Sequence, residues 1–332
     1  MLQMASFDPL VGETTAEETQ WYQVFGLRLQ SQVALTSNRQ PAAAPDALAN
    51  SDAAATAAEV RPLLIRRRIV SRPDTPEIIQ VAACCWTDGQ QVWLELPELG
   101  TLYISQAEIA VDLLPTADLD LLQVYLQGYA LGIQAMLSQQ LVLHATTLSR
   151  NGQAIVICGG SGLGKSTLAA ALLQKGFALV SDEVTIIDPQ GRVQPGFDDI
   201  KLWRDAVDVL QLPEADVQPV RSMLDKFYYR PATPIAQPMP VAAVYILESD
   251  NRNALTLEEL KGFAKFEPLR VQAYRQFLLG PLQLNSKYMQ YCGQRLGHIP
   301  LLKLTRSLQR LQAQVLEHLA NAIDLDATGR GL

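Results

Sequence analysis

The residues with the clearest chemical signature form one glycine-rich run. Residues 159–167 match the pattern G-x-x-x-x-G-K-[ST] without a mismatch. Glycines let the backbone curl so that its N–H groups converge on an anion, and the following helix adds the positive end of its dipole. In this pattern Lys165 reaches the β- and γ-phosphates, and the Ser166 hydroxyl can ligate Mg²⁺. We therefore expect ATP and Mg²⁺ to bind at this P-loop, whose residues are Gly159, Gly160, Ser161, Gly162, Leu163, Gly164, Lys165, Ser166 and Thr167.

A pair of acidic residues follows the P-loop at short range. Residues 177–181 (FALVS) favour a strand, and Asp182 and Glu183 come directly after it. In open α/β sheets, ligands lie at the carboxyl ends of the strands. A carboxylate at that edge can hold Mg²⁺ or accept the proton of an attacking hydroxyl. The pair is therefore a candidate for a second metal anchor or a general base.

The spacing of the two motifs excludes two large groups of P-loop proteins. Asp182 follows Lys165 by 17 residues, whereas transport ATPases and most switch GTPases carry their second acidic motif much further along the chain. The sequence also contains neither L-S-G-G-Q nor N-K-x-D. We therefore expect neither a transporter ATPase nor an ordinary GTPase.

Regular elements must position these residues. Residues 153–158 (QAIVIC) predict a central, buried strand that leads into the P-loop. The run LAAALLQK after the loop predicts a short helix that ends near Lys175-Gly176. Asn151-Gly152 predicts a tight hairpin that connects this strand to an earlier one over 141–148.

A longer helix is expected ahead of these strands. Pro115 and Asp118 mark its start, and apolar residues over 122–137 recur mostly at spacings of three and four. We place a domain boundary here, with an N-terminal module over 1–115 and the P-loop domain over 116–325.

The N-terminal module is expected to be rich in β-structure. Residues 38–59, mostly Ala, Pro, Asn and Asp, predict a flexible insertion. The basic run 66–68 is expected on a solvated strand edge, with contact to an acidic peptide as the alternative. Strand-like patches occur at 21–35, 62–71, 78–86, 90–96 and 101–113.

Composition excludes further classes of protein. Of 332 residues, 34 are acidic and 27 basic, so the net charge is −7. The chain therefore lacks the excess of positive charge that is typical of a general nucleic-acid binder. The most apolar stretch, 119–137, carries Asp120 and three glutamines and is not expected to cross a membrane. Four cysteines without metal-ligand spacing, and the lack of a secretory pattern at the N-terminus, favour a cytoplasmic protein with reduced thiols.

Together, the P-loop, the short helix and the acidic pair resemble the catalytic domain of HPr kinase/phosphorylase, which is distantly similar to phosphoenolpyruvate carboxykinase. The resemblance covers about 143–230, and His144 lies 15 residues before the first P-loop glycine, as in that family. It implies that Asp182 is the base that activates a serine hydroxyl, or the acid in the reverse, phosphorylase reaction. We expect His144 to orient Asp182 or share a proton with it near the γ-phosphate.

A wider branch of HPr kinase-like proteins looks closer still. Its Y-x-x-F-G-L segment corresponds to 22–27, and its later D-K pair corresponds to Asp225-Lys226. Glu183 stands where HPr kinases themselves usually have aspartate, and their glycine-rich signature does not follow it. Some members of this branch phosphorylate a serine of a precursor peptide, which implies a protein or peptide substrate bearing a serine.

The expected fold is therefore α/β, with a P-loop core of the HPr-kinase/PEP-carboxykinase-like type behind a β-rich module. The expected metal ligands are Ser166, Asp182 and Glu183. Related enzymes are hexamers, so a homo-oligomer is implied. A small-molecule kinase with the same core, or a nucleotide-binding regulator without transfer chemistry, is the alternative. The expected catalytic residues are Asp182, His144, Lys165 and Lys226, with Lys201, Arg204 and Arg230 as further candidates for balancing phosphoryl charge.

Overall fold

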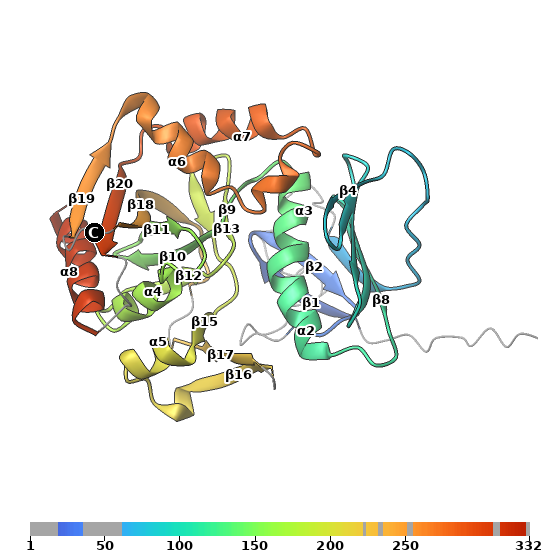
Figure 1. The fold of residues 1–332 in the computed structure, drawn as a ribbon, viewed down its shortest axis with the longest axis horizontal. Helices are drawn as coiled ribbons and strands as arrows, with labels where there is room; N and C mark the ends of the chain where they lie inside the picture. The colour runs from blue at the N-terminus through green and yellow to red at the C-terminus, as the bar shows by residue number, and fades with distance from the viewer. Residues whose placement is uncertain are drawn as a thin grey trace, which may run out of the picture.

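Two sheets and a helical segment between them form the body of the computed structural model (Figure 1). It describes residues 19–35, 62–221, 224–231, 235–250, 255–307 and 313–329. The predicted insertion over 38–59 lies outside the described residues. The mixture of helices and sheets confirms the predicted α/β class.

The N-terminal part of the described chain forms an eight-stranded sheet in the order β1-β2-β3-β8-β7-β6-β5-β4. Most neighbouring strands are antiparallel, but β3 runs parallel to both β2 and β8. The strands are β1 (Gln20–Val24), β2 (Leu27–Ser31), β3 (Leu63–Arg67), β4 (Ile79–Ala82), β5 (Cys85–Thr87), β6 (Val92–Leu96), β7 (Gly100–Ile104) and β8 (Glu108–Leu113).

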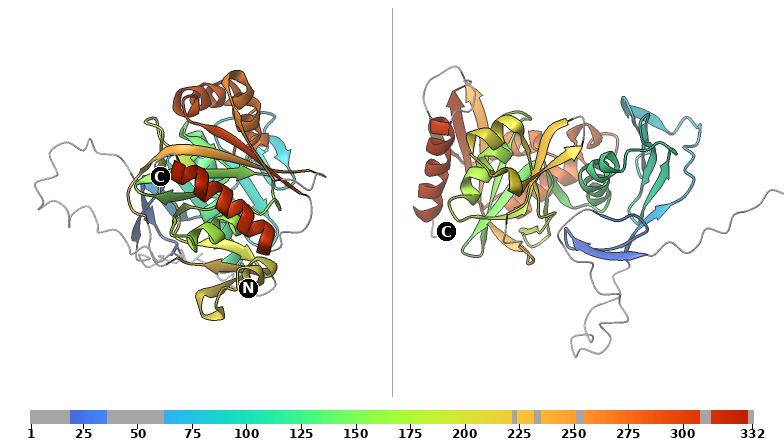
Figure 2. Two further views of the ribbon diagram at one scale, coloured as in Figure 1. Left: turned by 90° about the vertical axis from the view of Figure 1, so that its left-hand side faces the viewer. Right: turned by 90° about the horizontal axis from the view of Figure 1, so that it is seen from below.

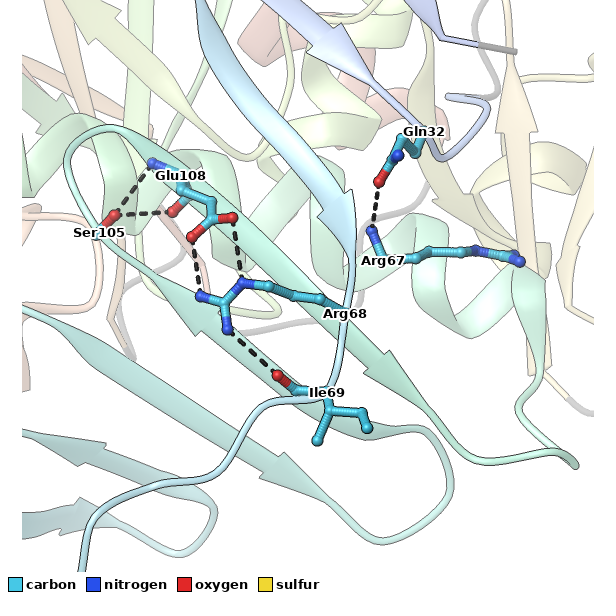
Figure 3. A network of polar contacts seen from close by, with 6 residues as sticks. All are labelled: Gln32, Arg67, Arg68, Ile69, Ser105 and Glu108. Carbon is cyan, nitrogen blue, oxygen red and sulfur yellow. Dashed lines mark hydrogen bonds and ion pairs between the residues drawn. The ribbon is translucent and has the colours of Figure 1, made fainter. Parts of the chain in front are cut away.

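The three arginines of the basic run 66–68 are exposed, as predicted, but the run does not lie on an edge strand, so that part of the prediction was wrong. It begins within β3, and both sides of β3 are paired, with β2 and with β8. The N–H of Arg67 donates to Gln32 Oε1 at 3.0 Å, and the guanidinium of Arg68 pairs with Glu108 at 2.9 Å (Figure 3). The backbone of the run lies beside β8 and Gln32, while its side chains are exposed.

A continuous helical segment lies between the two sheets (Figure 1). It consists of α2 (Leu119–Val124), the π-helical η1 (Tyr125–Ala130) and α3 (Leu131–Leu137). Asp118 caps its start, because the carboxylate accepts from the N–H groups of Asp120 and Leu121 at 2.9 and 3.2 Å. The expected helix is present, with one π-helical stretch inside it. Its buried side chains belong to an apolar cluster that also includes residues of both sheets.

The second sheet is mixed and has nine strands within the described residues. Its main order is β12-β10-β11-β18-β14-β13-β9, with β20 beside β18 and β19 beside β20. The pairs β11–β18 and β18–β20 are parallel. The strands are β9 (Leu141–Leu143), β10 (Ala145–Arg150), β11 (Gln153–Gly159), β12 (Ala178–Ser181), β13 (Thr185–Ile187), β14 (Arg192–Gln194), β18 (Met239–Asp250), β19 (Thr256–Leu260) and β20 (Leu301–Ser307).

Strand β11 is central, as its apolar sequence predicts, and it faces two separate cores. Val156 and Cys158 join the cluster that contains the central helical segment. Ile155 and Ile157 join a second cluster with α4 (Lys165–Leu173) and α8 (Ala313–Gly329). Figure 2 shows α8 lying across this face of the sheet. The alternation has the period of two expected for a strand that is covered on both faces.

A small sheet of order β15-β17-β16 lies beside α4 and carries α5. The strands are β15 (Ile200–Trp203), β16 (Val217–Arg221) and β17 (Leu224–Tyr229), and the helices that complete the fold are α5 (Arg204–Val209), α6 (Phe266–Val271) and α7 (Asn285–Tyr291), with short helical turns η2 (Glu214–Asp216), η3 (Gly262–Lys265), η4 (Gln276–Leu278) and η5 (Cys292–Leu296).

All four cysteines are free thiols in this structure, and three of them are buried. No described helix is long and apolar enough to cross a membrane.

Candidate active site

The P-loop joins the end of β11 to the start of α4. Gly162 and Gly164 adopt φ angles of +78° and +89°, which side chains other than glycine rarely tolerate. Gly159 has φ +148°, and a Cβ there would lie 2.7 Å from the carbonyl oxygen of Leu247 in the neighbouring strand. These positions therefore need glycine for backbone geometry, as the sequence pattern predicts.

One cavity of about 370 Å³ opens above the loop. This volume is within the usual range for small-molecule sites. It brings together the loop, the acidic pair and two of the four cations singled out from the sequence. Its lining comprises His144, Ser161, Gly162, Gly164, Lys165, Ser166, Thr167, Asp182, Glu183, Lys201, Leu202, Trp203, Asp205, Ala206, Val209, Lys226 and Arg306.

The ammonium of Lys165 is held by the loop and by His144. Its Nζ donates to the carbonyl oxygens of Gly159 and Gly160 at 2.8 and 3.2 Å and lies 3.2 Å from His144 Nε2. His144 Nδ1 lies 3.2 Å from the carbonyl oxygen of Glu183. Because a carbonyl only accepts and an ammonium only donates, His144 carries its proton on Nδ1 and is neutral. Burial and the charge of Lys165 lower the pKa of His144, which agrees with this assignment.

The backbone places His144 at a break between two strands. The predicted strand 141–148 is divided into β9 and β10, which pair with different partners, and the N–H of His144 donates instead to the carbonyl oxygen of Gln272 at 2.9 Å. The side chain consequently contacts Lys165 and Glu183. The expected partnership between His144 and Asp182 is not formed, because the two hydrogen-bonding nitrogens of the ring are already engaged.

Asp182 accepts three hydrogen bonds. Its Oδ1 accepts from the hydroxyls of Thr146 and Ser166 at 2.6 and 3.1 Å, and its Oδ2 accepts from the N–H of Lys201 at 3.1 Å. A carboxylate has about four acceptor positions. Oδ2 therefore retains one for a ligand in the cavity.

Glu183 occupies a strained backbone position and is paired with a cation. Its φ is +68°, and its Oε2 accepts from Lys201 Nζ at 3.0 Å. Burial alone would raise the pKa of Glu183, but the adjacent ammonium outweighs it and lowers that pKa to about 2. Glu183 is thus a carboxylate whose charge is already matched.

The four candidate cations separate into two groups. Lys201 and Lys226 line the cavity, and Lys226 Nζ lies 5.6 Å from the ring centroid of Trp203 at the cavity wall. Arg204 pairs with Glu214 at 2.6 Å. Arg230 donates to Gln218 at 3.0 Å, and neither arginine lines the cavity.

A small niche of about 10 Å³ adjoins the acidic pair. It shares Asp182, Glu183 and Lys201 with the main cavity and is also lined by Asp199. Asp199 is 4% exposed, and its Oδ2 is buried without a hydrogen-bond partner. Burial raises the pKa of Asp199 to about 7, although Lys201 opposes the shift.

Several residues at this site were not identified as candidates from the sequence. Thr146 stands two residues after His144, and the two-residue period of strands could have indicated that both reach the same side. Asp199 and Trp203 flank Lys201 within one short stretch, but an isolated aspartate or tryptophan carries no spacing signal. Arg306 comes from a distant strand and lines the cavity only because β20 pairs with β18.

The donor groups fit a nucleotide with Mg²⁺. Gly162 faces open space, since no atom lies within 4 Å of a Cβ built on it. No cluster of three or more His, Cys, Asp or Glu suited to a metal occurs among the described residues. Mg²⁺ usually keeps several waters and takes one or two carboxylates together with phosphate oxygens. The hydroxyl of Ser166 and the carboxylate of Asp182, 3.1 Å apart, match that demand.

Comparisons with known proteins found a short sequence match and a distant structural match. The chain is 41% identical over 54 residues to the HPr kinase/phosphorylase of Mycoplasmopsis pulmonis (strain UAB CTIP), and the matched stretch spans 16% of this chain and 18% of that relative. Among solved structures, the Hpr(Ser) kinase/phosphatase from Coxiella burnetii matches 56% of this chain and 98% of its own, with 14% identity and a TM-score of 0.29. No protein-family model matches the chain. The similarity of sequence therefore relates one short stretch of this chain to HPr kinase/phosphorylase.

Proposed function

We propose that this protein is an ATP-dependent kinase of the HPr-kinase type, which transfers the γ-phosphoryl group to a serine hydroxyl on a protein or peptide. The observation that carries the proposal is the contact of Asp182 with Ser166 beside Lys165, within one cavity above the P-loop. The sequence similarity to HPr kinase/phosphorylase supports the same class of enzyme.

ATP would supply the phosphoryl group in this reaction, and Mg²⁺ would balance the charge of its phosphates. The N–H groups of the P-loop and of the first turn of α4 bind phosphate oxygens. Lys165 exchanges its bonds to two loop carbonyls for bonds to the β- and γ-phosphates. Burial lowers the pKa of Lys165, although Asp182 opposes the shift, and an entering phosphate favours the charged ammonium.

Asp182 acts as the general base in this proposal. In this proposal the metal would be held by Ser166 and by phosphate oxygens, so the free acceptor position on Asp182 Oδ2 receives the proton of the acceptor hydroxyl while the serine oxygen bonds to phosphorus and the bond to the ADP oxygen breaks. Thr146, Ser166 and the N–H of Lys201 fix the direction of the carboxylate. Ser166 can donate to Asp182 and still offer a lone pair to the metal.

Lys226 is the proposed cation for the charge on the transferred group. Phosphoryl transfer is catalysed mainly by positioning and charge stabilisation, so a second cation beside Lys165 is useful. Lys226 lines the cavity, is half-buried, and lies over the neutral ring of Trp203. His144 is proposed to act on Lys165, and Glu183 stays paired with Lys201 in this proposal.

Incubation with ATP–Mg²⁺ and candidate acceptors tests the proposal. HPr and peptides encoded by neighbouring genes are offered, and phosphopeptides are identified by mass spectrometry, with Lys165→Ala as the inactive control and Lys175→Ala as a matched control outside the cavity. A phosphoserine that appears with the parent and with Lys175→Ala, but not with Lys165→Ala, supports a protein or peptide kinase.

Other outcomes separate the alternatives. ATP turnover with a small hydroxyl compound, but with no phosphopeptide, would replace the proposal with a small-molecule kinase. Nucleotide binding without any turnover would indicate a regulator. The homo-oligomeric state and the cytoplasmic location stay predictions.

A further inference from the structure

We propose that Lys201 is a positioning residue that fixes both acids of the site and keeps Glu183 out of the coordination shell of the metal. The inference deepens the proposed function and rests on it for the effect on rate. Its effect on metal binding can be measured without any transfer reaction.

Lys201 contacts the acidic pair through two separate groups. Its N–H donates to Asp182 Oδ2 at 3.1 Å, and its ammonium donates to Glu183 Oε2 at 3.0 Å. The side chain is only 9% exposed. Lys201 belongs to β15, where it pairs with Tyr228 of β17. Because Lys201 is anchored in this sheet through its backbone, it holds the carboxylates of Asp182 and Glu183 in a fixed position relative to each other.

The enclosure of Glu183 supports the second half of the proposal. Gly128 of the π-helical stretch lies beneath its carboxylate, since a Cβ on Gly128 would be 3.7 Å from Oε1 and 3.8 Å from Oε2. The ammonium of Lys201 occupies Oε2. A metal that recruited Glu183 would have to compete with the ammonium of Lys201, in a pair whose side chains are 9% and 27% exposed. The hydroxyl of Ser166 lines the same cavity and is not part of an ion pair.

The charges around the pair keep it ionised. Burial acts against the charged form of both groups, but their attraction outweighs it, so the pKa of Glu183 falls to about 2 and the pKa of Lys201 rises above its ordinary value. Asp199 and Tyr228 also face the ammonium, and Lys226 and His144 face the carboxylate. The pair is thus a fixed structural charge and does not titrate with the reaction.

Lys226 differs from Lys201 in each of these respects. It is half-buried in the same cavity and lies over the ring of Trp203. We therefore assign the task of meeting phosphoryl oxygen to Lys226, and Lys201 serves the carboxylates.

Titration of Mn²⁺ into the full chain with a non-hydrolysable ATP analogue tests the metal half, with calorimetry or electron paramagnetic resonance as the readout. Lys201→Met should tighten Mn²⁺ binding about tenfold, because it releases a carboxylate beside the metal, and charge count tunes such sites. Glu183→Gln should bind Mn²⁺ as the parent does, and the double variant should return to the parent value.

Two results would overturn the inference. One is unchanged Mn²⁺ affinity in folded Lys201→Met. The other is a roughly tenfold loss in Glu183→Gln, which would make Glu183 a direct ligand. If Lys201→Met does not fold, the question is still decided by Glu183→Gln and by the double variant. The double variant leaves no lone charge in the pair. Lys303→Met is the control, because it removes a lysine with an equal 3.0 Å pair to Glu248 outside the cavity.

Kinetics tests the positioning half. Lys201→Met should lower kcat at least about tenfold while KM for ATP changes only a few-fold, since a misplaced base affects the chemical step. Lys201→Arg should restore most of kcat. Equal kcat values in Lys201→Met and Lys201→Arg would refute a positioning role. A parent protein with no transfer activity would refute the proposed function, and the Mn²⁺ titration would still decide the metal half of the inference.

Discussion

The hydrogen bonds of Lys165 are compatible with the phosphate-binding role proposed for it. Its ammonium donates to two loop carbonyls and lies against neutral His144. All of these partners are acceptors that a phosphate oxygen can replace without leaving a buried positive charge unmatched.

Lys165→Ala should abolish measurable ATP–Mg²⁺ binding, because the counter-charge for the β- and γ-phosphates is lost. Isothermal calorimetry of the variant and of Lys175→Ala, at the end of the same helix, makes the comparison. Unchanged affinity in Lys165→Ala would show that the loop is not the nucleotide site.

Asp182→Asn should separate nucleotide binding from chemistry. The amide keeps the size of the carboxylate but does not accept a proton at neutral pH, and a positioned base is worth about 10²–10⁴-fold in rate. Single-turnover phosphotransfer should fall by that range, while ATP affinity changes a few-fold. The exposed Asp208→Asn on α5 is the control. A joint fall in rate and ATP–Mg²⁺ affinity would make Asp182 chiefly a metal ligand, and the parent rate would remove it from the mechanism.

The P-loop and the acidic pair beside it could be recognised in the sequence because their pattern is local. Nine consecutive positions encode the P-loop, and the acids stand directly after the next strand. The role of Lys201 could not be predicted from the sequence. Its ammonium meets Glu183 only because β15 returns to the acidic pair, and sequence reasoning assigned it to phosphate. Asp199 was missed for the same reason.

At the scale of elements, a hairpin of the N-terminal sheet supports the stretch that leads to Lys201. The tip of β1–β2 is Phe25-Gly26, and the N–H of Phe25 donates to the carbonyl oxygen of Pro195 at 2.7 Å. The ring of Phe25 packs edge-on against Phe197, with centroids 5.8 Å apart. The Y-x-x-F-G-L motif therefore acts through packing against the segment that enters β15.

Phe25→Ala should destabilise the protein by about 3–5 kcal/mol, since a large aromatic that is 4% exposed leaves a cavity at this junction. Phe263→Ala offers a matched control, because Phe263 is 92% exposed and its truncation should change stability by no more than about 0.5 kcal/mol. Chemical denaturation measures both. Similar losses in the two variants would contradict the packing role of the hairpin.

Period and turn chemistry predicted most of the elements near the site. The Asn151-Gly152 hairpin is formed between β10 and β11 with positive φ at both residues, and β11 is buried on both faces. The break at His144 was not predicted, because LVLHATTL reads as one apolar strand. Long-range pairing decides it, since β9 joins β13 while β10 joins β11 and β12.

At the scale of the whole molecule, one apolar cluster runs from the N-terminal sheet through the central helical segment to the second sheet. The boundary drawn at residue 115 marks a change of sheet, and the core continues across it. A buried carboxyl group at the edge of this core should therefore affect the stability of the entire protein. Asp199 is such a group, and its ionisation couples global stability to pH.

Asp199→Asn should change the pH dependence of unfolding with a definite sign. Burial raises the pKa of Asp199 from 3.8 to about 7, so between these values the folded protein binds a proton that the unfolded chain has lost. The resulting stability is complete below about pH 4 and is lost as the pH rises through about 7. A rise of about three in the pKa of Asp199 corresponds to about 4 kcal/mol in the free energy of unfolding. Asparagine stays neutral, so the variant should match the parent near pH 3.5 and exceed it at pH 8 by up to about 4 kcal/mol, measured by urea unfolding across that range. Parallel profiles for the two proteins would mean that Asp199 ionises at no cost to the fold.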